Sequence, residues 1–273
     1  MFQKPSVSVV IGTYNRLSYL KATVATVRDE LEKLPSEVIV VDGGSSDGTM
    51  EWLIEQKDII TIVQHNRGKW NGKPIERKSW GYFMNLGFKA AQGKYICMLS
   101  DDCLVIPSTI KQGVDAADAK IASGDKLGAV AFYWRNWPEQ KNYWVGLTFG
   151  SRIFVNHGLY LNAALQAVGY ADEDRYSFYH ADGDLCLRLW EAGYICIDSP
   201  NSYIEHRSDA NEAVRSTNLE TQQKDWATYT SKWQTLGVPD KDWLEKDFVD
   251  KHHTAEKYWE EGKRSSLLRR VRK

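Results

Sequence analysis

The stretch YICMLSDDCLVIP, residues 95–107, joins an apolar run to two adjacent carboxylates. The run has the length and composition of a strand that is buried on both faces, as in a parallel sheet. It stops at Asp101 and Asp102. Paired carboxylates at the end of a strand are natural ligands for a hard divalent cation, Mg²⁺ or Mn²⁺. A helix cap next to a solvated carboxylate would account for the pair equally well.

Strand-like and helix-like patterns alternate through the first half of the chain. Apolar runs at residues 7–12, 37–44, 60–65 and 94–99 predict strands. Helical patterns occupy residues 17–34, 48–56, 75–92 and the segment after Pro107. This alternation predicts an α/β fold with a mostly parallel central sheet and helices on both faces. Ligands bind beyond the carboxyl ends of such strands, where GTYNR, DGGSSDGT and SDD should meet at one edge.

The second half of the chain is less regular. Aromatic-rich extended segments at residues 127–137, 143–150 and 151–158 indicate a smaller mixed β region. A short helix is predicted at 162–169, a longer one between Asp182 and Gly193, and a strand at 194–200. Beyond about residue 210 the pattern is polar and helical to the end. We therefore expect a catalytic domain over residues 1–209 and a C-terminal helical extension over residues 210–273.

Composition narrows the classes of protein to consider. The formal net charge is −1, which argues against a general nucleic-acid binder. No apolar stretch reaches the roughly 20 residues of a membrane helix, and the N-terminus lacks the pattern of a secretory signal. The four cysteines form no C-x-x-C pair and lie in apolar contexts. We expect them to be buried thiols in a reducing, cytoplasmic environment.

Five motifs follow one another in a recognisable order. They are TYNR (13–16), VVDGGSSDGT (40–49), MNLGFKAAQGKYICMLSDD (84–102), HADGDLCLRLWEAGY (180–194) and EH (205–206). Together they resemble the family 2 glycosyltransferases with the GT-A fold, over residues 6–207. The resemblance implies a transferase that moves a sugar from a nucleoside-diphosphate sugar to an acceptor hydroxyl, with inversion at the anomeric carbon.

The resemblance also implies roles for individual residues. A donor, with a UDP-sugar as our first choice, would lie across the strand ends against Thr13, Tyr14, Asn15, Asp42, Asn85 and Asp101. Asp102 and His206 would bind the metal ion, Mn²⁺ or Mg²⁺. Asp182 would be the catalytic base that takes the proton from the acceptor hydroxyl.

The expected acceptor is a saccharide or a lipid-linked saccharide. Trp134 and Trp137 lie in an aromatic segment where their rings would stack on a sugar, although packing in the core would explain them as well. Asp184 is a second acid in the same motif as Asp182 and would contact the acceptor, replace Asp182 as the base, or hold the loop. The basic C-terminus after Lys263 predicts either a peripheral contact with the inner face of a membrane or a solvated helix end.

Two positions depart from the family pattern. Ser100 stands where the first acid of the family's D-x-D motif is expected, and Ala181 stands where an acid often precedes the catalytic Asp. These departures keep open a non-catalytic protein that binds nucleotide-sugars on the same scaffold. A sugar nucleotidyltransferase is a third alternative, but residues 13–21 lack the glycine-rich, basic signature that it would carry.

Overall fold

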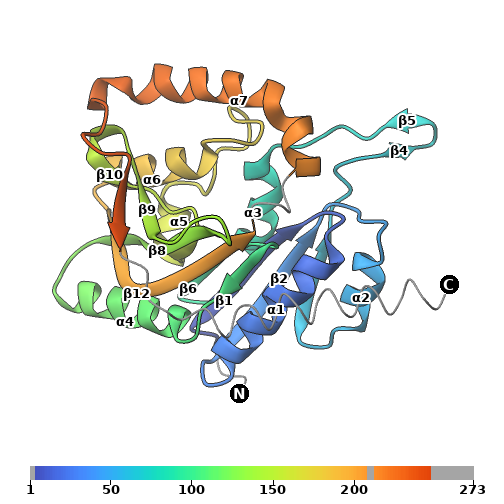
Figure 1. Cartoon of the computed structure of the whole chain (residues 1–273), viewed down its shortest axis with the longest axis horizontal. Helices are drawn as coiled ribbons and strands as arrows, with labels where there is room; N and C mark the ends of the chain where they lie inside the picture. Colours follow the sequence, from blue (N-terminus) through green and yellow to red (C-terminus); the bar gives the residue numbers. More distant parts are fainter. Residues whose placement is uncertain (1–3, 208–211, 247–273) are drawn as a thin grey trace.

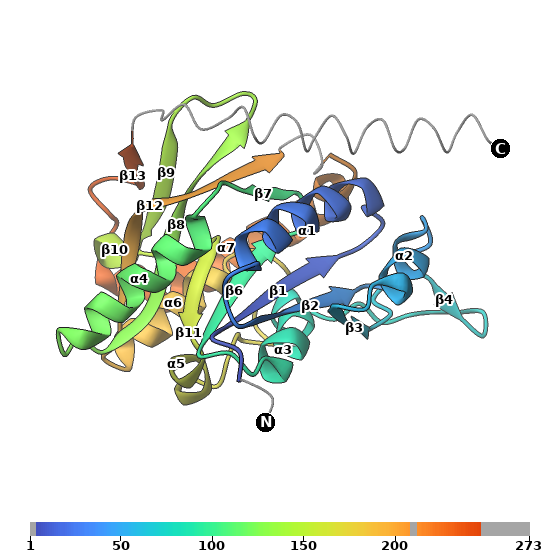
Figure 2. The same ribbon diagram turned by 90° about the horizontal axis from the view of Figure 1, so that it is seen from below.

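A computed structural model describes residues 4–207 and 212–246 (Figure 1). Within these residues, eleven strands form one sheet, and eight of them follow the order β10-β9-β8-β11-β6-β1-β2-β3. Helices lie on both faces of this sheet (Figures 1 and 2). The architecture is therefore the α/β layering that the strand–helix alternation predicts.

Four parallel strands form the centre of the sheet. They are β1 (Val7–Thr13), β2 (Ser36–Asp42), β3 (Ile59–Val63) and β6 (Tyr95–Ser100), arranged as β6-β1-β2-β3. The helices between and after them are α1 (Leu17–Leu31), α2 (Thr49–Glu55), α3 (Trp80–Ala90) and α4 (Thr109–Ala122). All four strands and all four helices were predicted from the sequence. The carboxyl ends of the strands consequently lie at one edge.

The start of α3 differs from the prediction. The helical pattern begins at residue 75, but the helix begins at Trp80, where the side chain of Ser79 accepts a hydrogen bond from the Tyr82 amide. The preceding residues form a hairpin of β4 (Lys69–Trp70) and β5 (Lys73–Pro74), which projects from the body (Figure 1). Asn71 and Gly72 at its tip both have positive φ, as a tight two-residue hairpin turn requires.

Side chains of the parallel strands alternate between two hydrophobic layers. Val9 and Ile11 pack with the buried face of α1, whereas Val10 packs with Met84 and Phe88 of α3. The α3 helix approaches the sheet closely at Gly87, where an added Cβ would lie 2.5 Å from Cγ1 of Val10. Burial of both faces explains why these strands read as continuous apolar runs.

The second half adds the mixed part of the sheet. Its elements are β7 (Cys103–Val105), β8 (Leu127–Trp137), β9 (Tyr143–Thr148), η1 (Phe149–Ser151), β10 (Arg152–Ile153), β11 (Gly158–Leu161), α5 (Asn162–Ala167), α6 (Ala181–Glu191) and β12 (Ile195–Arg207). The strand expected at 151–158 is mostly irregular, because only residues 152–153 pair with β9. The strand expected at 194–200 continues to Arg207 and pairs in parallel with β8.

The C-terminal segment is helical only in part. Its helix α7 (Glu212–Trp233) is followed by η3 (Gln234–Leu236) and then by β13 (Trp243–Lys246), which pairs with β9. The prediction of helix to the end of the chain is therefore wrong at residues 243–246. The boundary at 209/210 and the basic residues 263–273 lie outside the described residues, and the division into two domains stays a prediction.

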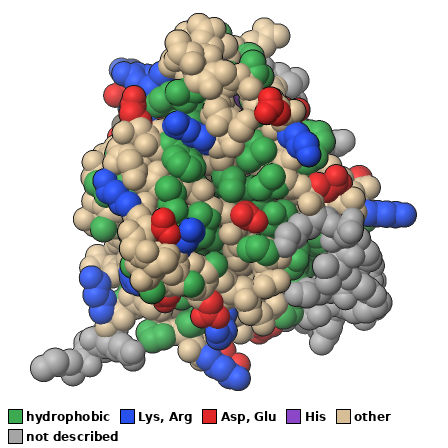
Figure 3. Space-filling model, turned by 90° about the vertical axis from the view of Figure 1, so that its left-hand side faces the viewer, with side chains coloured by type: hydrophobic (Ala, Val, Ile, Leu, Met, Phe, Trp, Pro, Cys, Tyr) green, Lys and Arg blue, Asp and Glu red, His purple; other side chains and the backbone are tan. Residues whose placement is uncertain are grey.

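The cysteines are buried thiols, as expected from the sequence. All four cysteines are buried and none is in a disulfide. Among the described residues, no helix is long and apolar enough to cross a lipid bilayer. On the face that carries the mixed β region, hydrophobic side chains gather near the centre and side chains of both charges are interspersed (Figure 3).

Candidate functional site

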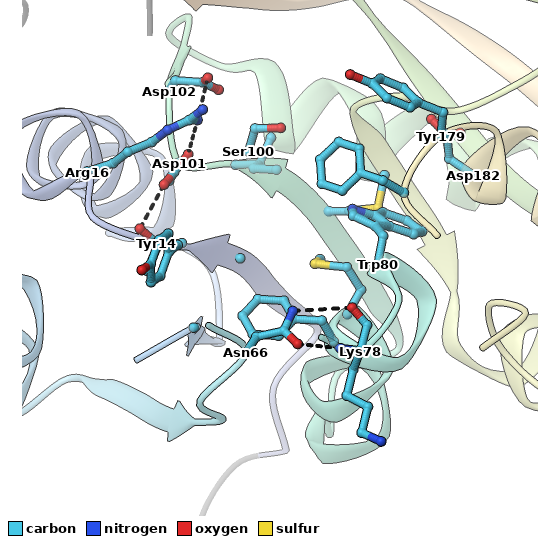
Figure 4. Close-up of a pocket in the computed structure, with 18 of the residues that line it drawn as sticks. Tyr14, Arg16, Asn66, Lys78, Trp80, Ser100, Asp101, Asp102, Tyr179 and Asp182 are labelled. Carbon is cyan, nitrogen blue, oxygen red and sulfur yellow. Dashed lines mark hydrogen bonds and ion pairs between the residues drawn. The ribbon is translucent and has the colours of Figure 1, made fainter. Parts of the chain in front are cut away.

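A cavity of about 370 Å³ opens at the carboxyl ends of the parallel strands. Its walls include Thr13 at the end of β1, Gly43 just after β2 and Ser100 at the end of β6. Asp182 from α6 and His206 from β12 complete it from the second half of the chain. The convergence of strand ends predicted from the sequence is therefore confirmed, and Figure 4 shows the side chains around this cavity.

Arg16 holds the acid pair, the two adjacent carboxylates of Asp101 and Asp102. Its Nη1 lies 2.9 Å from Oδ1 of Asp101 and 2.8 Å from Oδ2 of Asp102 (Figure 4). Burial raises the pKa of Asp101 to about 6, with the charge of Asp102 adding to the effect and Arg16 opposing it. Burial disfavours the charged guanidinium, but the two carboxylates outweigh it and raise the pKa of Arg16. Arg16 was not singled out from the sequence, although it is the last residue of TYNR.

His206 reaches Asp102 through the pairing of β12 with β7. His206 stands opposite Cys103 in this register, and the Arg207 amide donates to the Asp102 carbonyl at 2.9 Å. Nε2 of His206 then lies 3.5 Å from Oδ1 of Asp102. Nδ1 lies 2.9 Å from the acceptor Oδ1 of Asn136, which favours the tautomer with its proton on Nδ1 and a lone pair on Nε2.

Asp102 and His206 fit a divalent cation as a pair of protein ligands. A carboxylate oxygen and an imidazole lone pair face each other, and the hydrogen bond from Nδ1 to the Asn136 side chain orients the imidazole. No group of three His, Cys, Asp or Glu side chains placed to hold a metal occurs in residues 4–207 and 212–246. Water and phosphate oxygens are the ligands that commonly complete the shell of Mg²⁺ held by one or two protein side chains.

Asp182 lies on the opposite side of the cavity from the acid pair (Figure 4). It stands in the first turn of α6, half-buried, and its Oδ1 accepts a hydrogen bond from the Gly183 amide at 2.9 Å. Burial raises the pKa of Asp182, while the Gly183 amide and His180 act in the opposite direction. A carboxylate with a raised pKa in a cavity is suited to accept a proton.

Cations and aromatic rings form much of the remaining wall. Arg67, Arg77 and Lys78 line the cavity together with Arg16. Lys78 pairs with Glu76 and Arg16 with the acid pair, and Arg67 and Arg77 add positive charge that favours a bound anion. Burial, with the charge of Arg67, lowers the pKa of Arg77. The aromatic side chains in the wall are Tyr14, Trp80, Phe83, Phe178 and Tyr179. The sequence pattern did not single out Arg67, Arg77 or Lys78; a basic cluster after the third strand was the available signal.

Three of the six predicted donor-binding residues line the cavity. They are Thr13, Tyr14 and Asp101. The Thr13 hydroxyl donates to Oδ2 of Asp101 at 2.7 Å, and the Arg67 guanidinium lies 5.2 Å from the centre of the Tyr14 ring. Their roles with a donor stay predictions.

The other three predicted donor residues hold loops and are absent from the cavity wall. Asp42 is fully buried, and its carboxylate accepts hydrogen bonds from the amides of Gly44 and Ser45 and from the Ser45 hydroxyl. Asn15 ties the loop after β1 to the loop after β2. Its backbone N–H donates to the Ser45 hydroxyl, and its side-chain Oδ1 accepts from the backbone N–H of Ser46. These contacts support structural roles for both side chains.

Asn85 also binds protein groups. Its side chain exchanges hydrogen bonds with the backbone of Ala171, at 2.9 and 3.1 Å, and donates to Glu173 at 2.7 Å. It therefore fastens α3 to the loop before α6. A single sequence cannot separate this role from ligand binding, because both place an amide at the same end of the sheet.

None of the three predicted acceptor residues is among those that line the cavity. Trp134 is 8% exposed and packs against Trp144, with ring centres 3.7 Å apart. Trp137 lies under the guanidinium of Arg207. Asp184 is fully buried, and its carboxylate accepts hydrogen bonds from Tyr176, Arg188, Lys232 and Trp233. These placements favour the packing interpretation of the two tryptophans and make Asp184 a structural anchor.

The loop before α6 is held by a carboxylate from α7. Asp225 is fully buried and accepts hydrogen bonds from the amides of Ser177, Phe178 and Tyr179, at 2.8–2.9 Å. Phe178 and Tyr179 line the cavity, so the C-terminal helix fixes part of its wall. No sequence pattern singled out Asp225, because its partners are backbone groups.

Replacing Asp225 by Ala should therefore weaken the fold. Three amides would lose a charged acceptor in a buried place, and we expect the free energy of unfolding to fall by about 2 kcal/mol. Urea unfolding of the variant measures this loss. Lys224→Ala, an exposed change on the same helix, is the control, and equal stability of the two variants would contradict the assignment.

Comparison with known proteins places the chain among glycosyltransferases. The sequence profile of Glycosyl transferase family 2 matches residues 8–165. An uncharacterized protein of Sinorhizobium fredii, y4gI, is 26% identical over 246 residues, which span 78% of this chain and 26% of that protein. A chondroitin synthase of Pasteurella multocida is 30% identical over 107 residues, which span 38% of this chain and 10% of the synthase. The chain thus matches only a fraction of the length of these relatives.

Solved structures share the fold. A mannosyltransferase of Pyrobaculum calidifontis, determined in complex with GDP-Man and Mn²⁺, superposes with a TM-score of 0.59 at 17% identity. The alignment covers 84% of this chain and 65% of the mannosyltransferase. This neighbour has the GT-A fold, which confirms the expected fold class. The profile covers more than half of the sequence, and the chain therefore belongs to glycosyl transferase family 2.

Proposed function

We propose that the protein transfers a sugar from a nucleoside-diphosphate sugar to a hydroxyl of a saccharide, with inversion at the anomeric carbon. The observation that carries the proposal is the shared cavity, in which Asp182 lies across from the pair of Asp102 and His206. A base on one side, and on the other a pair of side chains that could hold a cation for the leaving diphosphate, are two elements that suit a single displacement.

In this proposal, Asp182 is the catalytic base. Its carboxylate accepts the proton of the acceptor hydroxyl as that oxygen attacks the anomeric carbon of the donor sugar. The bond from this carbon to the diphosphate oxygen breaks in the same step, and the electron pair leaves with the diphosphate. Attack from the side opposite the leaving group inverts the anomeric centre.

The opposite side of the cavity would hold the leaving diphosphate. Arg16 beside the acid pair and Arg67 beside Tyr14 supply positive charge there. Asp102 and His206 would hold Mn²⁺ or Mg²⁺, which when bound supplies a Lewis acid against the charge that develops on the diphosphate. The P. calidifontis mannosyltransferase, determined with GDP-Man and Mn²⁺, supports this part of the proposal by similarity. Ser100 contributes a neutral oxygen to the same wall instead of a further charge.

A thermal-shift screen tests donor binding directly. UDP, GDP and dTDP are each added at saturating concentration, with Mn²⁺ and then with EDTA in excess. At a concentration 100 times its dissociation constant, a diphosphate that binds only the folded state stabilises it by about 2.7 kcal/mol, and we expect EDTA to remove most of this shift. UDP is our first choice for the responding nucleotide.

The Asp102→Asn variant tests whether the cation in this screen binds at Asp102. It keeps the shape of the side chain but removes the charge that would bind the cation, so the metal-dependent shift should fall. Asp115→Asn, an exposed carboxylate paired with Lys111, should respond like the wild-type protein. No shift with any of the three diphosphates would contradict the proposed donor class.

Activity assays distinguish an enzyme from a binding protein. They use the sugar conjugate of the nucleotide that gives a thermal shift, and measure its hydrolysis and the transfer of its sugar to added saccharides. Release of nucleoside diphosphate that depends on Mn²⁺ supports catalysis, whereas binding without turnover supports the non-catalytic alternative. A lipid-linked acceptor, a cytoplasmic location and a peripheral membrane contact through the C-terminus stay part of the proposal. Activity on vesicle-bound acceptors tests them.

A further inference from the structure

We propose that Trp226 on α7, together with His180, forms a platform on which a pyranose ring of the acceptor stacks. The inference rests on the proposed function, because it names where the acceptor binds. It replaces Trp134 and Trp137, whose rings the structure places in packing contacts. It also gives the C-terminal segment, which lies beyond the family profile, a part in the reaction.

Trp226 is an exposed aromatic residue that is nevertheless held in place. Half of its surface is exposed, a large fraction for a tryptophan. Its ring lies parallel to that of Phe149, with ring centres 6.2 Å apart, and 5.1 Å from the ring of His180. These two packed neighbours restrict the rotation of the Trp226 side chain, so this side chain would lose little additional conformational entropy when a sugar binds.

His180 connects this exposed ring to the cavity. It lines the cavity and precedes Asp182 by two residues. Its backbone has a φ of 65°, and its ring stacks on Tyr229 of α7, with ring centres 5.2 Å apart. The imidazole therefore stacks on Tyr229 and contacts Trp226, both on α7. Together these rings make a continuous aromatic surface from Trp226 to the cavity.

The chemistry of this surface suits a neutral sugar. Aromatic faces cover the apolar C–H side of a pyranose. Burial lowers the pKa of His180 against the opposing charges of Asp182 and Asp225, which favours the uncharged imidazole. Arg16 lies with the acid pair across the cavity from Asp182, whereas Arg77 interacts with Tyr179, so the Asp182 side offers the acceptor aromatic rings and one cation. A sugar stacked on Trp226 would extend toward Asp182, where its hydroxyl must lie for deprotonation.

Saturation-transfer NMR on the full chain tests the platform. The probes are the methyl glycosides of glucose, galactose, mannose and N-acetylglucosamine, added with Mg²⁺ and the nucleoside diphosphate that gives a thermal shift. We expect at least one glycoside to bind, and Trp226→Ala to weaken it about three- to tenfold. Trp226→Tyr should retain most of the affinity.

The matched control is Trp243→Ala on β13. Trp243 is 49% exposed, against 50% for Trp226, and its ring contacts Trp144. This control should leave glycoside binding unchanged, and neither variant should alter the thermal shift by the diphosphate. Wild-type affinity in Trp226→Ala, an equal loss in Trp243→Ala, or no glycoside binding to the wild-type protein would overturn the platform. Absence of any diphosphate shift would instead contradict the proposed function.

Discussion

Replacing Asp182 by Asn is expected to lower kcat for sugar transfer by about 10²- to 10⁴-fold, the usual contribution of a positioned general base. Asparagine keeps the size of the side chain and its acceptor for the Gly183 amide, but it cannot take a proton from the acceptor hydroxyl. The change should leave the thermal shift by the donor diphosphate intact, since Asp182 lies across the cavity from the acid pair. Initial rates at saturating donor and acceptor measure the effect.

Stability separates this loss of activity from unfolding. Burial raises the pKa of Asp182 in the folded protein, so the folded state binds the proton more tightly than the unfolded state does. Stability from this group therefore falls as pH rises from the unfolded pKa through the folded one. At neutral pH the charged carboxylate costs stability, and the Asn variant should be at least as stable as the wild type. Near-full transfer activity in this variant would reject Asp182 as the base.

The pH profile gives a second measure of the same group. The base must be ionised to act, so log(kcat/KM) should rise with pH up to the raised pKa of Asp182 and then level off. The Asn variant should lose this ascending limb. An unchanged limb would assign the proton acceptor to another residue.

Replacing Asp184 by Ala is expected to reduce the free energy of unfolding by about 3–5 kcal/mol, as removal of one partner of a buried ion pair does. The carboxylate is fully buried and lies 2.8 Å from the nitrogens of both Arg188 and Lys232. Trp233 and Tyr176 donate to it as well. Its loss would leave these donors without their shared acceptor and would detach the end of α7 from α6. Chemical denaturation with urea measures the change.

Acid titration should show the same network. Burial alone would raise the pKa of Asp184, but the hydrogen bonds from Lys232, Arg188 and Trp233 outweigh it and lower the pKa. Stability from a lowered carboxyl pKa is present above the unfolded pKa and is lost as pH falls through the folded one. Asp115→Ala, which removes an exposed carboxylate, should cost less than about 1 kcal/mol. A similarly small cost for Asp184→Ala would contradict its role as an anchor.

These two acids show why neighbouring positions in one motif differ in role. Residues two positions apart on a helix face nearly opposite directions, so Asp182 reaches the cavity while Asp184 points into the protein. The sequence shows both residues only as aspartates, two positions apart. The role of Asp184 depends on Lys232 and Trp233 of α7, which are 48 and 49 residues further along the chain.

Much of the fold could be predicted from the sequence for a local reason. The strands that carry Val9, Val10 and Ile11 are buried on both faces, so they read as apolar runs, and the helices between them show the periodicity of one buried face. The edge that carries Thr13 and Asp102 followed from the rule that parallel strands share their carboxyl ends, whereas Asp182 was expected there only from the resemblance to family 2 glycosyltransferases. The hairpin at residues 69–74 was missed because its two-residue strands are too short to show a period.

The amino-acid sequence alone was sufficient for the parallel sheet, the edge that carries the site, and the family, because hydrophobic period and motif order are properties of the chain itself. The three-dimensional arrangement was needed to assign Arg16 to the acid pair, Asp42 and Asn85 to loop contacts, and Asp225 to the loop that carries Phe178 and Tyr179. The physical reason is that the sequence gives the type of a side chain but not its partner. A carboxylate, an amide or a ring is the same residue whether it faces a cavity or a backbone amide. Which of the two it meets depends on segments that are distant in sequence and adjacent only after folding.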